Sequence, residues 1–127
     1  MSCQSRETTS ESKVIRTAKQ DAPLAVLMRE MFVDMEEIKM SVTEKENLGA
    51  YMEKHQNILI AKATDPAVRD SSFQIMADAY LVHLGALENS QPEKVLENYR
   101  ALQQSCVACH QQKCPGPIKK INSLKVN

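Results

Sequence analysis

A repeat of apolar residues between positions 24 and 42 constrains the fold of this 127-residue chain more than any other feature. Its members are Leu24, Met28, Met31, Met35, Ile38 and Val42, spaced by alternating steps of four and three. That spacing places the apolar side chains on one stripe of a helix, which must pack against partner helices. Asp21 suits the N-cap and Pro23 the first turn, so we predict a helix over about residues 22–42.

A second helix is predicted over about residues 44–63. Thr43 and Glu46 have the spacing of a capping box at its start, and Asp65-Pro66 stops it. The inward positions are Leu48, Met52, His55, Leu59 and Ala63.

Two more helices follow with the same apolar spacing. The third begins at Asp65-Pro66 or at Asp70-Ser71 and ends before Asn89. Ser90, Pro92 and Glu93 open the fourth, which ends at the segment Cys114-Pro115-Gly116-Pro117, followed by a short basic tail. The inward positions are Phe73, Ala77, Tyr80, Leu84 and Leu87 in the third helix, and Val95, Tyr99, Leu102, Cys106 and Cys109 in the fourth.

Four amphipathic helices joined by short connections predict an all-α protein folded as an antiparallel up-down-up-down four-helix bundle. Helices one and four are then neighbours. The bundle domain covers residues 20–127, and residues 1–19 form a polar tether with almost no apolar periodicity. Met1-Ser2-Cys3 resembles the start of a mature bacterial lipoprotein, in which Cys3 would carry the lipid; the alternative is an incidental cysteine in a tail.

Composition narrows the range of partners. Sixteen basic residues balance sixteen acidic ones, which argues against a nucleic-acid partner. No run of eighteen apolar residues occurs, so we expect no transmembrane segment. Aromatic residues make up only 4% while seven Met are present, a core to which a buried porphyrin would add apolar area.

The strongest chemical signal is a Cys-x-x-Cys-His motif formed by Cys106, Cys109 and His110. It is the attachment signature of c-type haem, because two thiols three residues apart on a helix can each add to one vinyl group while the next residue offers an imidazole to the iron. The simpler alternative is that Cys106 and Cys109 form a dithiol redox pair. Cys114 adds a third thiol, so a zinc or iron-sulfur site without haem is a further alternative, and Cys114 could equally form a disulfide or stay free.

A motif at the end of a fourth amphipathic helix resembles the class II c-type cytochromes, the cytochrome c prime family. The resemblance covers residues about 20–114 and rests on Cys106, Cys109 and His110, with Tyr99 one heptad earlier where the family often has an aromatic residue. None of the 17 residues after His110 is a Met, so a sixth iron ligand must lie upstream.

The resemblance implies that the first helix faces the distal side of the haem, and it favours Met28 as the distal ligand. Met31 and Met35 lie on the same stripe, and the alternative for all three is ordinary core packing. His55 and His83 are second-line ligand candidates, each more simply explained as a partly buried histidine. Tyr99 is expected to pack near the porphyrin.

These observations predict a monohaem c-type cytochrome that carries single electrons, with one covalent haem c, His110 as proximal ligand and Met28 as distal ligand. An empty distal side would imply a five-coordinate protein that binds small gases such as NO or CO. We expect no enzyme activity, redox proteins as partners, and a homodimer as a further assembly. Because c-type haem is attached after export, we expect a preceding signal peptide and a periplasmic or exported protein, tethered to the membrane if Cys3 is lipidated.

Overall fold

A computed structural model of the chain describes residues 21–126. Within this part the protein has five α-helices and three short 3₁₀ turns, and no strand forms there. The predicted all-α class is therefore confirmed. The polar tether over residues 1–19 and the lipid site predicted at Cys3 lie outside the described residues.

Helix α2 (Pro23–Glu44) agrees closely with the first predicted helix. It ends in a Schellman motif, in which the Lys45 amide donates to the Val42 carbonyl (3.3 Å) and the Glu46 amide to the Ser41 carbonyl (2.8 Å). Lys45 has a φ of 57°, a left-handed conformation that such motifs usually assign to glycine.

The predicted second helix over residues 44–63 is wrong. In its place stand the single-turn helix α3 (Met52–His55) and the 3₁₀ turn η2 (Gln56–Leu59), with non-helical chain on either side. The capping box predicted at Thr43 does not form, because the Thr43 hydroxyl donates back to the Lys39 carbonyl within α2 (2.8 Å).

Arg69 gives the physical reason why this segment does not continue as a helix. The Arg69 guanidinium donates to the carbonyls of Ile58 (3.0 Å) and Ala61 (3.1 Å), and to that of Leu59. In a continuous helix those carbonyls would accept from amides four residues later. The same guanidinium lies 4.8 Å from the centre of the Phe73 ring, so Arg69 ties η2 to the helix that follows.

Helix α4 (Ser71–Glu88) follows the 3₁₀ turn η3 (Pro66–Val68) and starts at the second of the two predicted positions. The Asp70 carboxylate caps it by accepting from the Phe73 amide (3.0 Å). All five predicted inward side chains of this helix are buried: Phe73, Ala77, Tyr80, Leu84 and Leu87. Ser90 donates to the Ala86 carbonyl (2.8 Å), so it closes α4 instead of forming the predicted capping box with Glu93.

Helix α5 (Val95–Lys113) follows the 3₁₀ turn η4 (Pro92–Lys94) and ends just before Cys114, as predicted. Helix α6 (Ile118–Asn122) was not predicted and lies where a basic tail was expected. Two hydrogen bonds from α5 hold this segment, one from the Gln103 side-chain amide to the Ile121 carbonyl in α6 (2.9 Å) and one from the Tyr99 hydroxyl to the Leu124 carbonyl just after α6 (2.6 Å).

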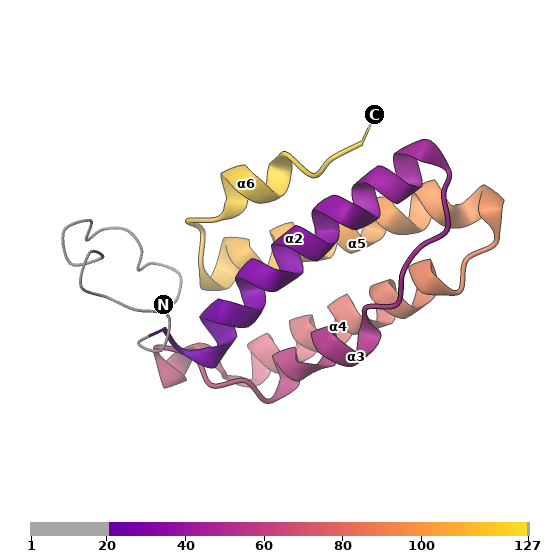
Figure 1. Cartoon of the computed structure of the whole chain (residues 1–127). Coiled ribbons are helices and arrows are strands. Elements are labelled where there is room, and N and C mark those ends of the chain that lie inside the picture. Colours follow the sequence, from indigo (N-terminus) through magenta and orange to yellow (C-terminus); the bar gives the residue numbers. More distant parts are fainter. Residues whose placement is uncertain (1–20, 127) are drawn as a thin grey trace.

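The long helices α4 and α5 run antiparallel (Figure 1), with Lys113 paired to Asp70 at one end (2.7 Å) and Asn98 bonded to Ser90 at the other (2.7 Å). Helix α2 packs against α5, which agrees with the neighbouring positions predicted for helices one and four. Helix α3 packs on α4, and α6 packs on α5 close to α2. The core between these elements holds mainly aliphatic side chains and methionines, together with the buried polar residues Asp34, His55 and Gln103.

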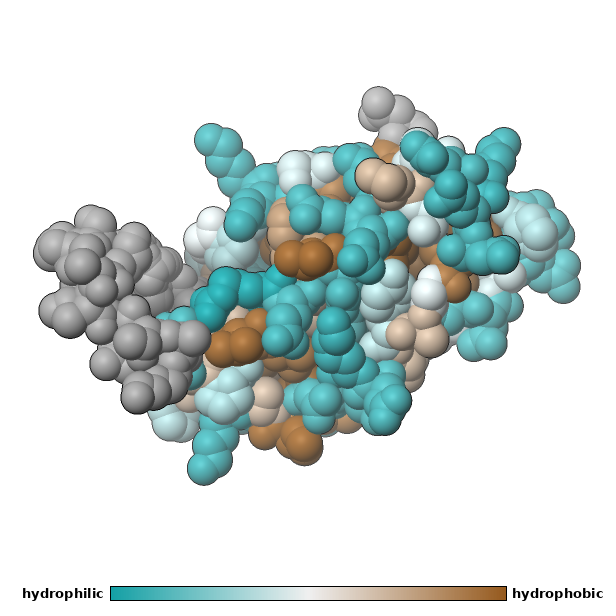
Figure 2. Space-filling model, viewed as in Figure 1, coloured by the Kyte–Doolittle hydropathy of each residue, from teal (hydrophilic) through white to brown (hydrophobic). Residues whose placement is uncertain are grey.

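The face of the molecule drawn in Figure 2 is largely hydrophilic, with apolar side chains scattered over it. The large apolar side chains exposed within residues 21–126 include Val33 and Met40 on α2 and Ile60 just after η2. No helix in this part of the chain is long and apolar enough to cross a membrane.

Candidate functional site

The Cys-x-x-Cys-His motif lies in the last turns of α5. Cys106 and Cys109 are half-buried and carry free thiols, and His110 is half-buried beside them. Because α5 remains helical through Lys113, the two thiols are neighbours on the helix surface. The Cys106 thiol also lies close enough to Tyr80 and Tyr99 that its charge would raise the pKa of both phenols. Cys106 therefore borders the protein core.

Both thiols are held in the protonated form. Burial raises the pKa of Cys106 to about 12, and the neighbouring Cys109 adds to the rise. Burial also raises the pKa of Cys109, although the positive charge of Lys113 opposes it. Redox-active dithiols need a lowered thiol pKa, for which a helix N-terminus is favourable, whereas this pair lies at a helix C-terminus. The environment thus disfavours a dithiol redox site.

The imidazole of His110 is oriented by a backbone carbonyl. Its Nδ1 donates to the Cys114 oxygen (2.9 Å), and the Cys114 amide donates in return to the His110 oxygen (3.1 Å). With the ring proton on Nδ1, the Nε2 lone pair is available for a metal. Burial lowers the pKa of His110, which keeps the ring neutral. A ring N–H held by a carbonyl is the usual support of a metal-bound histidine.

The donor set fits a covalently attached haem. Such a haem requires two thiols and a neutral imidazole nitrogen, and α5 provides Cys106, Cys109 and the Nε2 atom of His110. These three side chains would hold the group.

Two hollows on the surface of the described residues lie away from the motif. A groove of about 1150 Å³ opens between the C-terminal end of α2 and the first turns of α5, lined among others by Val42, Leu87 and Val95. A smaller hollow of about 350 Å³ lies beside Met40 and Leu124. Neither hollow is lined by a residue of the motif.

Met28, the predicted distal ligand, lies on the helix that packs against α5. It is half-buried at the edge of the core cluster, whereas Met31 and Met35 are only 6% and 2% exposed. Withdrawing either of those two from the core would leave a cavity, which costs stability. Met28 can turn toward a ligand at lower cost, and its role stays a prediction.

The two second-line histidine candidates differ in their surroundings. His55 is fully buried, and both ring nitrogens are engaged, Nδ1 with the Tyr80 hydroxyl and Nε2 with Asp34 (each 2.7 Å). It therefore has no nitrogen left for iron in this structure. His83 is half-buried on α4 and lies outside that cluster.

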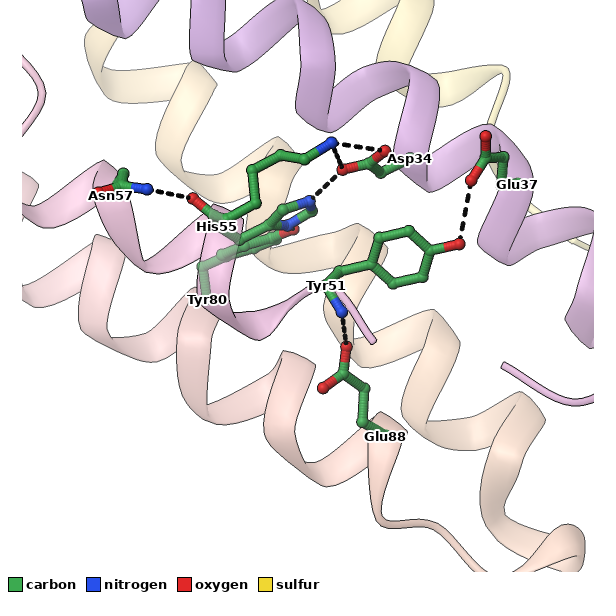
Figure 3. A network of polar contacts seen from close by, with 8 residues as sticks. Asp34, Glu37, Tyr51, His55, Asn57, Tyr80 and Glu88 are labelled. Carbon is green, nitrogen blue, oxygen red and sulfur yellow. Dashed lines mark hydrogen bonds and ion pairs between the residues drawn. The ribbon is translucent and has the colours of Figure 1, made fainter. Parts of the chain in front are cut away.

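A polar network around His55 joins α2, α3 and α4 (Figure 3). Lys54 pairs with the same Asp34 carboxylate (3.0 Å), and Glu37 accepts from the Tyr51 hydroxyl (3.1 Å). Asp34 is only 5% exposed and was missed by sequence reasoning. Its signal was present, because Asp34 follows Met31 by three residues and precedes Ile38 by four, a helical spacing shared with the buried stripe.

Tyr99 and Cys114 lie on either side of the motif in the sequence, and both are buried. Tyr99 is fully buried one heptad before Cys106, and its contact with haem stays a prediction. Cys114 is buried and disulfide-bonded. No group of three or more His, Cys, Asp or Glu residues within positions 21–126 is arranged to hold a metal ion.

Comparison of the chain with protein-family models, with curated proteins and with solved structures gives no match.

Proposed function

We propose that this chain is a monohaem c-type cytochrome that carries single electrons. Cys106 and Cys109 anchor one haem through thioether bonds, and His110 is its proximal ligand. The observation that carries the proposal is the state of the motif on α5: two free, protonated thiols beside an imidazole whose Nδ1 is fixed by the Cys114 carbonyl and whose Nε2 is available.

The remaining features support electron transfer over the other roles. The bound haem supplies a one-electron centre, and a Met sulfur as second axial ligand tends to raise its potential. With Met31 and Met35 buried and both nitrogens of His55 occupied, Met28 is the most accessible of the methionine candidates on α2. A place in the class II cytochromes, a four-helix-bundle arrangement and an exported location belong to the same proposal.

To test this proposal, the full chain is expressed behind an export signal together with c-type haem maturation proteins. We expect a red protein that keeps its haem through denaturing electrophoresis and acid-acetone extraction. The double variant Cys106→Ser/Cys109→Ser loses covalent haem, while the matched histidine control His83→Gln keeps it and His110→Gln loses the axial imidazole spectrum. A colourless wild type, or haem that acid acetone extracts, contradicts the proposal.

Visible spectra of the Met28→Leu variant decide between electron transfer and gas binding. We expect the wild type to be low-spin with a thioether-to-iron band that the substitution removes. Met35→Leu is the control: it keeps the band because Met35 is not the proposed ligand, and it keeps the fold because leucine fills a similar volume in the core. A wild type that is high-spin and shifts on adding CO assigns the distal side to gas binding instead.

A further inference from the structure

Asp34, His55 and Tyr80 form a hydrogen-bonded chain across the protein core, with each residue on a different helix (Figure 3). The side chains of Asp34 and His55 are 7% and 0% exposed, and Tyr80 as a whole residue is 4% exposed. The two bonds that join the three residues are both 2.7 Å long. Haem attachment does not require these three hydrogen-bonded residues. Its burial makes a change of charge there energetically expensive unless a second change of charge compensates it.

The bonding partners fix where the protons lie. A carboxylate only accepts hydrogen bonds, so His55 Nε2 carries a proton and donates it to Asp34. In the neutral ring Nδ1 then holds a lone pair, and the Tyr80 hydroxyl donates to it. Burial lowers the pKa of His55, with Asp34 opposing and Lys54 assisting, which keeps the ring neutral in this arrangement.

A proton added to Nδ1 would reverse one of these bonds. His55 would then donate to the Tyr80 oxygen, and the Tyr80 hydroxyl proton would have to turn away from the ring. Tyr80 belongs to the core cluster against which Cys106, the haem anchor on α5, packs. The chain thus connects a proton site with the place where the haem would attach.

Within the described residues, three charged groups adjoin His55. Asp34 faces it from α2, Lys54 comes from α3, and Glu88 lies on α4. The neighbour on α5 is Cys106, which carries no charge either as a protonated thiol or as a thioether. Lys54 is 46% exposed and contacts both carboxylate oxygens of Asp34, at 3.2 and 3.0 Å. It marks the point at which the buried chain meets solvent.

We propose that the Asp34–His55–Tyr80 chain is a proton-binding site linked to the oxidation state of the haem, an inference that rests on the proposed function. When the protein accepts an electron from a redox partner, the affinity of His55 Nδ1 for a proton rises, and the proton that it takes from solvent offsets the added charge. On oxidation the electron leaves to the partner and the proton returns to solvent.

The test measures the midpoint potential of the full-length, haem-loaded protein against pH. We expect the potential of the wild type to fall as pH rises through the titration of His55, and a tenfold tighter binding of the proton in the reduced protein corresponds to about 59 mV in all. In His55→Gln the slope disappears. The matched control His83→Gln removes a histidine outside the chain and keeps the slope.

A second variant and a second readout guard against misfolding. Tyr80→Phe keeps the ring packing but removes the hydroxyl, and we expect a reduced slope with an unchanged covalent haem spectrum. Nitrogen NMR of His55 should show a protonated Nε2 and an unprotonated Nδ1 in the oxidised protein at neutral pH. A red protein whose potential does not vary with pH, or whose slope survives His55→Gln, overturns this inference alone, while a colourless protein overturns the proposed function.

Discussion

Replacing Asp34 by alanine should destabilise the protein by leaving a buried histidine nitrogen without a partner. The Asp34 carboxylate is the acceptor for His55 Nε2 at 2.7 Å, and the His55 side chain is fully buried. If the ring changes tautomer to satisfy one nitrogen, the other loses its partner. A lost hydrogen bond to a charged group, with the donor left buried, costs about 2 to 3 kcal/mol in the free energy of unfolding.

Urea unfolding of Asp34→Ala and two matched variants measures this cost. Asp34→Asn keeps an oxygen for Nε2 to donate to, so we expect a loss of about 1 kcal/mol or less. Glu37→Ala removes an exposed acceptor on the same helix and should change stability by less than about 0.5 kcal/mol. Equal losses for Asp34→Ala and Asp34→Asn, with unchanged slopes against urea, would refute the assignment of the cost to the His55 hydrogen bond.

Two further predictions concern the haem-free chain and the end of α2. Burial lowers the pKa of His55 and His110 below 6.5 in the folded protein, so the unfolded chain binds protons first as the pH falls. The free energy of unfolding should therefore be highest above that pH and decrease below it. Urea midpoints measured at about pH 7.5 and 5.5 should show a smaller decrease in His55→Gln than in the wild type. Lys45→Gly should stabilise the protein by about 0.5 to 1 kcal/mol, since glycine adopts the left-handed φ of 57° without strain; an unchanged or lower melting temperature would speak against strain at Lys45.

The three long helices could be predicted from the sequence because their signals are local. Apolar residues at helical spacing identify α2, α4 and α5, and the side chain of Asp70 marks one start while Cys114-Pro115 marks one end. The exposed and buried faces of α4 followed from the same spacing.

The errors arise where contacts distant in the sequence decide the local structure. Residues 44–63 have a helical pattern, but Lys45 turns the chain after α2 and Arg69 takes the carbonyls that a longer helix would have used. Helix α6 is too short to show a periodic pattern and depends on hydrogen bonds from Tyr99 and Gln103.

In the candidate site, too, the features with a local sequence signal could be predicted and those set by distant contacts could not. The haem motif is contiguous, so Cys106, Cys109 and His110 were evident from sequence alone. The support of His110 by the Cys114 carbonyl depends on how α5 ends, and the chain from Asp34 to Tyr80 depends on packing among three helices. Sequence reasoning placed His55 on an inward face but had no means of identifying its two partners.

The measurement that tests the central claim most directly is the intact mass of the full-length protein, matured together with c-type haem attachment proteins and denatured before analysis. We expect a mass raised by one haem per chain, with neither Cys106 nor Cys109 open to thiol alkylation. A mass without haem, with both thiols alkylated, would contradict it.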